Sequence, residues 1–119
     1  MTTGNPHSQS VIPRVFVREP AGFVTFLRDI FGAQGEFHDG RPADVVIGDS
    51  VIMVSGIEER GEFPAFLYIY VENADAAFHR ALDAGAESLE EPADMFYGDR
   101  RAMIRDPFGN ILQIAHRVV

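Results

Sequence analysis

Two stretches of this chain present the same structural signals in the same order. Residues 14–33 and residues 68–86 each begin with alternating apolar residues, continue through a polar turn and then show helical spacing that ends in Gly-Ala. Short strand-like segments follow both stretches. We therefore expect two equivalent halves with a functional site where their inner faces meet, so the inward-facing strand positions are the first candidates for function.

The first half is predicted to contain a strand, a helix and three short strands. The first strand covers Val11–Val17, and Pro20 favours a helix start because proline fits the first helical turn. Apolar residues then recur at helical spacing, and Gly32 predicts the end of the helix. Short strands are expected at residues 35–39, 43–47 and 51–55.

The second half is predicted to repeat this order. A strand covers Ala65–Val71, Asn73 caps a helix that continues to about Ala84, and Gly85 ends it. The remaining strands are expected at residues 87–91, 100–105 and 111–116, with a turn at 106–110. The order βαβββ occurs twice, which indicates an α+β fold.

The length of 119 residues indicates one domain. We expect a disordered tail at residues 1–10 and a single domain over 11–119. Its halves would cover about 11–56 and 65–117, joined by a charged linker at 57–64.

Composition excludes several kinds of chemistry and partner. The chain has no cysteine and no lysine, which excludes disulfides, thiolate metal sites and Schiff-base catalysis. A net charge of −8 argues against a nucleic-acid partner. No apolar stretch is long enough to span a membrane, and the first nine residues lack the apolar segment of a signal peptide. We expect a cytoplasmic protein.

Several local strings add a resemblance to a known family. These strings are Val46-Ile-Gly-Asp-Ser-Val-Ile-Met-Val54, the strand and helix start over 65–76, Ala84-Gly-Ala86, Phe96-Tyr-Gly-Asp-Arg100 and Arg105-Asp-Pro-Phe-Gly-Asn110. Their order and spacing resemble the vicinal oxygen chelate superfamily, and most closely its glyoxalase/bleomycin-resistance-like proteins. The resemblance implies that each half curls its mixed sheet, that the two halves form a cup with the helices outside, and that two chains pair as a homodimer.

The resemblance also locates four strand positions at which metal-dependent members hold a divalent ion with His, Gln or Glu. These positions fall on Arg14, Met53, Tyr68 and Gln113. Arginine has no lone pair to donate, methionine suits copper(I), tyrosine ligates only when ionised, and glutamine is a neutral ligand. We therefore expect no metal and no other cofactor. Each residue also has a structural explanation: Arg14 as a surface ion pair, Met53 as core, Tyr68 as a cover over the core and Gln113 as a backbone partner.

The central strand predicts what the cup binds instead. Leu67, Ile69 and Val71 suit packing under a helix, whereas the alternating Phe66, Tyr68 and Tyr70 suit a ligand-facing wall. The leading hypothesis is metal-independent binding or sequestration of a small, flat or apolar molecule, such as a drug or natural product, as in antibiotic resistance by the bleomycin resistance proteins. The acidic balance is compatible with a cationic ligand. The candidate ligand-binding residues are Arg14, Phe16, Met53, Phe66, Tyr68, Tyr70, Phe96, Tyr97, Met103 and Gln113.

Two alternatives remain open at the level of sequence. One is a glyoxalase-like lyase or isomerase, or a dioxygenase, with an atypical metal site or with metal-free acid–base chemistry. In the metal-free version Arg14 holds an oxyanion and Tyr68 or His38 moves a proton. His38 near Asp44 is a further candidate pair, with a solvated histidine as the default. The other alternative is a dimeric interaction module with a filled cup.

Overall fold

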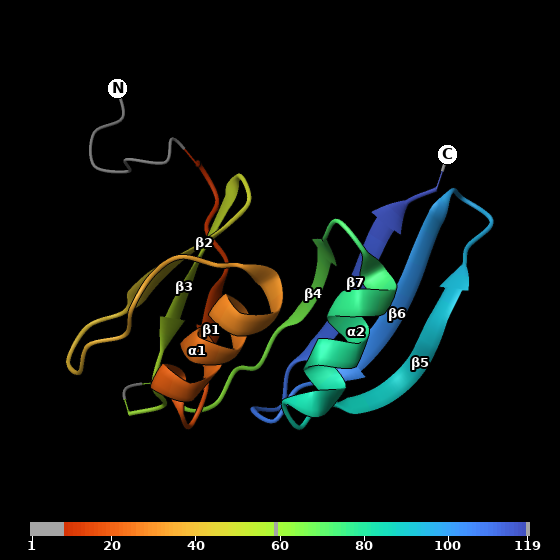
Figure 1. The fold of residues 1–119 in the computed structure, drawn as a ribbon. Coiled ribbons are helices and arrows are strands. Elements are labelled where there is room, and N and C mark those ends of the chain that lie inside the picture. The colour runs from red at the N-terminus through yellow and green to blue at the C-terminus, as the bar shows by residue number, and fades with distance from the viewer. Residues whose placement is uncertain (1–8, 59, 119) are drawn as a thin grey trace. The chain divides into compact units, whose positions relative to one another are not determined.

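The computed structural model describes residues 9–58 and 60–118, so most of the tail expected at residues 1–10 lies outside the described part. The chain divides into two compact units, Met1–Phe63 and Pro64–Val119. Each unit combines one helix with one mixed sheet, which confirms the α+β class (Figure 1). Within the described residues, none of the helices has the length and apolar character needed to cross a bilayer.

The first unit packs one helix on a three-stranded sheet. Its elements are β1 (Arg14–Phe16), α1 (Pro20–Phe31), β2 (Ala43–Ile47) and β3 (Ser50–Ser55). The strand order is β1-β3-β2, with β1 parallel and β2 antiparallel to β3. Pro20 begins α1 and Gly32 ends it in the left-handed conformation, both as predicted. The apolar stripe of α1 is buried through Phe23, Val24, Phe26, Leu27 and Ile30.

The prediction of a strand at residues 35–39 is wrong. The structure places a loop there, and the only pairing nearby is an isolated bridge between Gln34 and Val46. Phe37 is the single apolar side chain of the segment, so there is no alternating apolar face to bury. Gly35 also adopts a positive φ of 137°. The first unit is therefore βαββ and does not repeat the full βαβββ order.

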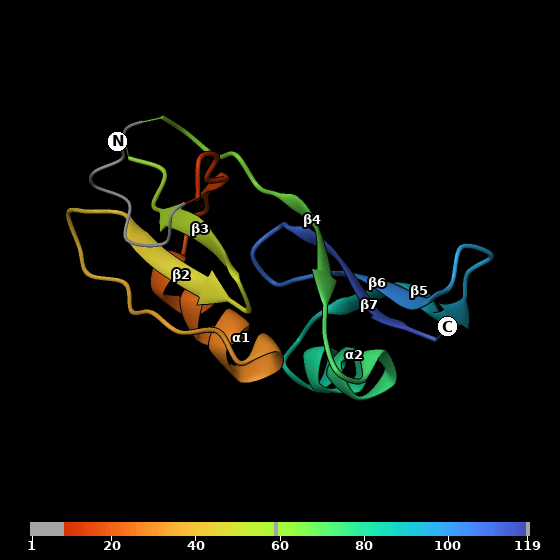
Figure 2. The same ribbon diagram turned by 90° about the horizontal axis from the view of Figure 1, so that it is seen from above.

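The second unit has the predicted βαβββ order. Its elements are β4 (Phe66–Tyr70), α2 (Ala74–Asp83), β5 (Glu87–Asp94), β6 (Asp99–Arg105) and β7 (Ile111–Arg117). The sheet order is β4-β7-β6-β5, and only the β4–β7 pair is parallel. Helix α2 lies along one face of this sheet (Figure 2). β5 continues to Asp94, three residues beyond its predicted end, because Pro92 is tolerated on an edge strand.

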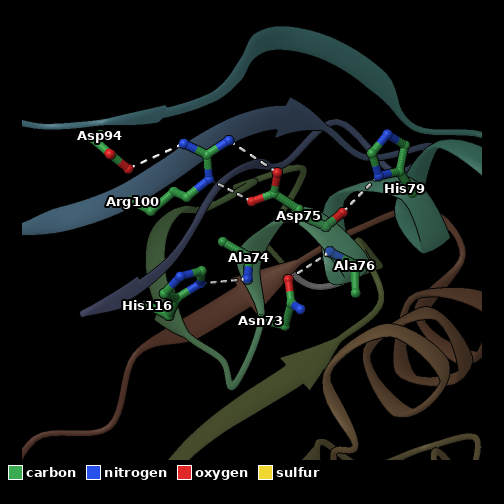
Figure 3. Close-up of polar contacts among 8 residues, drawn as sticks. All are labelled: Asn73, Ala74, Asp75, Ala76, His79, Asp94, Arg100 and His116. Carbon is green, nitrogen blue, oxygen red and sulfur yellow. Dashed lines mark hydrogen bonds and ion pairs between the residues drawn. The ribbon is translucent and has the colours of Figure 1, made fainter. Parts of the chain in front are cut away.

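Two side chains satisfy backbone donors at the start of α2 (Figure 3). Asn73 accepts a hydrogen bond from the Ala76 N–H at 3.0 Å, which confirms it as the N-cap. His116 on β7 accepts one from the Ala74 N–H through Nδ1 at 2.7 Å. The helix start is thereby joined directly to the sheet.

Arg100 makes a second link between α2 and the sheet. From β6, its Nε and Nη2 donate to the two carboxylate oxygens of Asp75, at 2.6 and 3.0 Å, and its Nη1 donates to Asp94 on β5 at 3.1 Å (Figure 3). The bidentate bond from Arg100 lowers the pKa of Asp75. Both links place α2 on the sheet face that carries Arg100 and His116. The opposite face of the sheet is not covered by α2.

Asn110 connects the turn before β7 to the start of β4. This fully buried side chain donates to Asp106 Oδ2 at 2.9 Å and accepts from the Ala65 N–H at 2.8 Å. Asp106 also accepts from the backbone N–H groups of Phe108 and Asn110. The turn therefore sets the register in which β4 runs beside β7.

Candidate functional site

The open face of the β4-β7-β6-β5 sheet is rich in aromatic and polar side chains. Ile69, Ile104, Leu112 and Ile114 are buried. Along the strands, these buried residues alternate with the residues of the open face, as the sequence predicted for β4. On β4 the open face carries Phe66, Tyr68 and Tyr70, which are 65%, 38% and 50% exposed. We call this side of the sheet the open face.

A buried carboxylate lies at one end of the open face. Asp99, at the start of β6, is 2% exposed, and its Oδ2 accepts hydrogen bonds from the hydroxyls of Tyr68 at 2.6 Å and Tyr70 at 2.7 Å. These two bonds stabilise the carboxylate and lower the pKa of Asp99. The pKa of Tyr68 is raised mainly by burial and then by its bond to Asp99. The pKa of Tyr70 is raised mainly by its bond to Asp99 and then by burial. Both phenols are therefore neutral at pH 7.

The hydrogen bonds continue from Tyr68 to an ion pair. The Tyr97 hydroxyl lies 3.2 Å from that of Tyr68, and Arg101 donates to Tyr97 at 3.2 Å. Because the Tyr68 proton is directed to Asp99, Tyr97 is the donor to Tyr68. Arg101 also donates to Glu90 at 2.6 Å. One directed chain thus runs from Arg101 through two phenols to the buried carboxylate.

Arg117, near the end of β7, contacts the same carboxylate more loosely. Its Nε lies 3.5 Å from Asp99 Oδ1, and its guanidinium lies over the Tyr70 ring, 5.4 Å from the centroid. The Arg117 side chain is 66% exposed. Asp99 Oδ1 is buried and has no hydrogen bond in the described part of the chain.

The four positions that the family resemblance assigns to the metal ion of metal-dependent members lie in adjacent pairs. Arg14 on β1 is the register partner of Met53 on β3, and Tyr68 on β4 is the partner of Gln113 on β7. Arg14 donates to Ser55 at 3.2 Å, and its positive charge would repel a dication. Tyr68 keeps its proton through Asp99. The donor set therefore does not fit a divalent ion, and no group of three His, Cys, Asp or Glu side chains within residues 9–58 and 60–118 is arranged to hold one.

The first unit contains a hollow of about 370 Å³ next to β1. The predicted residues Arg14 and Phe16 both line it, and the Arg14 guanidinium lies 4.9 Å from the centre of the Phe16 ring. The other lining residues are Asp39, Gly40, Arg41, Pro42, Ser55, Gly56 and Glu58. Its surface thus combines one aromatic ring with side chains of both charges.

The structure groups the predicted site residues by unit. Arg14, Phe16 and Met53 belong to the first unit, and the other seven belong to the second. Met103, Gln113 and Tyr68 lie side by side across β6, β7 and β4, while Phe96, in the turn before β6, is fully exposed. The candidate pair of His38 with Asp44 does not form: His38 Nε2 lies 3.8 Å from Glu36 Oε1 and its side chain is 58% exposed, in agreement with the default of a solvated histidine.

Sequence reasoning missed four residues of the open face: Glu90, Asp99, Arg101 and Arg117. Asp99 had one available signal, because it lies in the Phe-Tyr-Gly-Asp-Arg string that contributed to the family resemblance. The three others are charged strand residues of a kind that normally lies in solvent. Only the fold shows that Arg101 and Arg117 meet the tyrosines and that Glu90 pairs with Arg101.

Comparison with known proteins places this geometry in a family. The model of the Glyoxalase/Bleomycin resistance protein/Dioxygenase superfamily matches residues 9–114. A stretch of 50 residues is 40% identical to uncharacterised proteins of Mycobacterium bovis and Mycobacterium tuberculosis. It covers 42% of this chain and only about a third of those relatives, 33% and 29%.

Solved structures show the same fold at low sequence identity. TioX from Micromonospora sp. ML1 is 21% identical, with a TM-score of 0.72 over 93% of this chain and 98% of TioX. A glyoxalase/bleomycin resistance protein/dioxygenase family enzyme from Burkholderia phytofirmans is also 21% identical, with a TM-score of 0.74 over 89% and 95% of the two chains. With these likenesses and a family match over nearly its whole length, the chain belongs to the glyoxalase/bleomycin resistance protein/dioxygenase superfamily.

Proposed function

We propose that this protein binds a small, flat or apolar molecule without a metal ion and without transforming it. The observation that carries the proposal is the side-chain set at the four metal-equivalent strand positions. A guanidinium and a thioether form one pair, and a neutral phenol and a carboxamide form the other. Catalysis in the metal-dependent members relies on an ion that stabilises developing negative charge, and this set gives such an ion no strong ligand.

The surfaces that remain suit binding. Three exposed aromatic rings on β4 offer apolar area for stacking. In the first unit, Arg14 and Phe16 line a hollow large enough for a small ligand. We assign ligand contacts to the ten predicted residues in their respective units. We further propose that this binding serves resistance to a drug or natural product.

Metal dependence is the first test. Protein purified without a histidine tag is titrated with Zn²⁺, Ni²⁺, Mn²⁺ and Fe²⁺ in a calorimeter, and ligand binding is then repeated in the presence of a chelator. We expect that no ion binds stoichiometrically and that the chelator leaves the affinity for the ligand unchanged. A tightly bound stoichiometric ion, or affinity lost on chelation, would refute the proposal.

Ligand binding is the second test, and the chain contains its own probe. There is no tryptophan, and all three tyrosines lie on or beside the open face. A panel of flat aromatic compounds is screened by tyrosine fluorescence and calorimetry, with Tyr70→Leu as the weakened variant and Phe37→Leu, in a loop of the first unit, as the matched control. Recovered ligand is analysed for chemical change. Turnover of any bound compound would favour the enzyme alternative over a binding protein.

A further inference from the structure

The tyrosine hydroxyl groups of the open face donate their hydrogen bonds to other residues of the same face. Tyr68 and Tyr70 both donate to Asp99 Oδ2, and Tyr97 donates to Tyr68. A phenol that donates its proton still has oxygen lone pairs that accept hydrogen bonds. The tyrosines therefore present oxygen acceptors to anything that approaches, and the second oxygen of Asp99, which lies 3.5 Å from Arg117 Nε, becomes available when that side chain moves away. Such a surface favours ligands that carry donors.

The charge of this surface points in the same direction. Asp99 is 2% exposed, and its Oδ1 is buried without a hydrogen bond in the described residues. A buried carboxylate oxygen in this state is costly unless a positive group compensates for it. The two tyrosine rings, with centroids 5.4 Å apart, add the negative faces of their π systems.

Arg117 occupies the place where a ligand cation would lie. Its guanidinium stands over the Tyr70 ring and reaches Asp99 Oδ1 at 3.5 Å, which is too long for a hydrogen bond. Because the Arg117 side chain is 66% exposed while Asp99 is buried, the guanidinium can turn into solvent when another cation takes its place beside the carboxylate. The chain's own cation therefore marks the subsite and can be displaced from it.

We propose that the open face of the second unit binds an organic cation, a flat or apolar body bearing a guanidinium, amidinium or amino-substituted aromatic cation, which replaces Arg117 at Asp99 Oδ1 and over Tyr70. This inference rests on the proposed binding function and adds the class of ligand. The positive group pairs with Asp99, and the body lies on the exposed rings of β4. The net charge of −8 adds a general attraction for such a ligand.

The test compares two dyes of the same tricyclic shape, cationic proflavine and neutral acridone, by calorimetry on the full chain. Wild-type protein is expected to prefer proflavine by roughly threefold to thirtyfold. Raising the salt concentration from about 50 to about 300 mM should weaken proflavine binding and leave acridone binding unchanged.

Three variants identify the subsite. Asp99→Asn keeps the shape and removes the charge, so it should abolish the preference for proflavine. Arg117→Gln removes the internal competitor and should strengthen proflavine binding several-fold without affecting acridone. Arg105→Gln changes the net charge by the same amount, but Arg105 pairs with Glu87 and not with Asp99. This variant therefore controls for the effect of net charge alone.

The outcomes separate this inference from the function on which it rests. Equal affinity for the two dyes, or a preference that survives Asp99→Asn, overturns the cation subsite and leaves metal-free binding in place. If neither dye nor any other flat compound of the panel binds, both proposals fall. If Asp99→Asn does not fold, the comparison of Arg117→Gln with Arg105→Gln decides: equal effects of these two variants on proflavine binding overturn the subsite.

Discussion

Replacing Asn110 with alanine removes the side chain that ties β4 to the turn before β7. The amide of Asn110 donates to Asp106 and accepts from the Ala65 N–H, and the residue is fully buried. The bond to Ala65 lies directly before β4, so it supports the register that places Tyr68 beside Gln113. The substitution therefore tests stability and the support of the site together.

The expected cost follows from the two groups that lose their partner. A buried donor or acceptor left unsatisfied costs about 1–3 kcal/mol. Asn110→Ala leaves the buried Asp106 Oδ2 in this state and removes the partner of the partly buried Ala65 N–H, so we expect a loss of about 2–4 kcal/mol in the free energy of unfolding. A domain of this size has about 5–15 kcal/mol in total. The variant should thus be close to the limit of stable folding.

Urea unfolding followed by tyrosine fluorescence measures this loss in the second unit alone, because all three tyrosines belong to that unit. The matched control is Asn73→Ala. Asn73 is exposed and caps α2 with a single side-chain bond to Ala76, so its removal should cost only about 1 kcal/mol. If Asn110→Ala costs no more than Asn73→Ala, the assignment of Asn110 as the connection between β4 and the β7 turn is wrong.

Two further predictions test the loop of the first unit and the buried carboxylate. Gly35→Ala would place Cβ 2.6 Å from the Asp44 carbonyl oxygen at a positive φ, and should cost roughly 2–6 kcal/mol in urea unfolding followed by circular dichroism. Gly48→Ala, with a φ of 59° and open space around it, should cost only about 1–2 kcal/mol; equal costs would contradict the close approach. The bond to Asp99 is the main cause of the raised pKa of Tyr70, so Asp99→Asn should shift phenolate absorbance to lower pH in an alkaline titration. Because the folded pKa lies above the ordinary value of 10.0, the contribution of Tyr70 to stability is complete below about pH 10 and is lost as the pH rises through the folded pKa; an unchanged titration would show that Asp99 is not the cause.

Most of the fold was predictable because local patterns and tertiary packing agree. Pro20 and Gly32 bound α1, and Asn73 caps α2, as their local chemistry indicates. The alternation on β4 correctly separates the exposed rings from the buried Ile69. The exception is the loop at 35–39, where the turn residues at 40–42 suggested the end of a strand that the segment itself does not form.

The candidate site was less predictable because it depends on long-range neighbours. The aromatic character of β4 is visible in the sequence, but Asp99 lies about 30 positions further along the chain and becomes a partner of Tyr68 and Tyr70 only through the β4-β7-β6 order. Nothing local distinguishes Arg117 from an ordinary exposed cation. The separate turn that carries Tyr97 is likewise brought to Tyr68 only by folding.

Asp99 connects the two functional arguments. At Tyr68 a metal ligand would have to be a phenolate, yet burial and the bond to Asp99 hold the phenol in its neutral form. A divalent ion at this position would therefore first have to remove a proton that the protein stabilises. The same carboxylate, with one oxygen occupied by two tyrosines and the other facing Arg117, attracts positive charge that needs no such deprotonation. An organic cation satisfies Asp99 without disturbing the tyrosines, which is why the residues that disfavour metal binding also favour a cationic ligand.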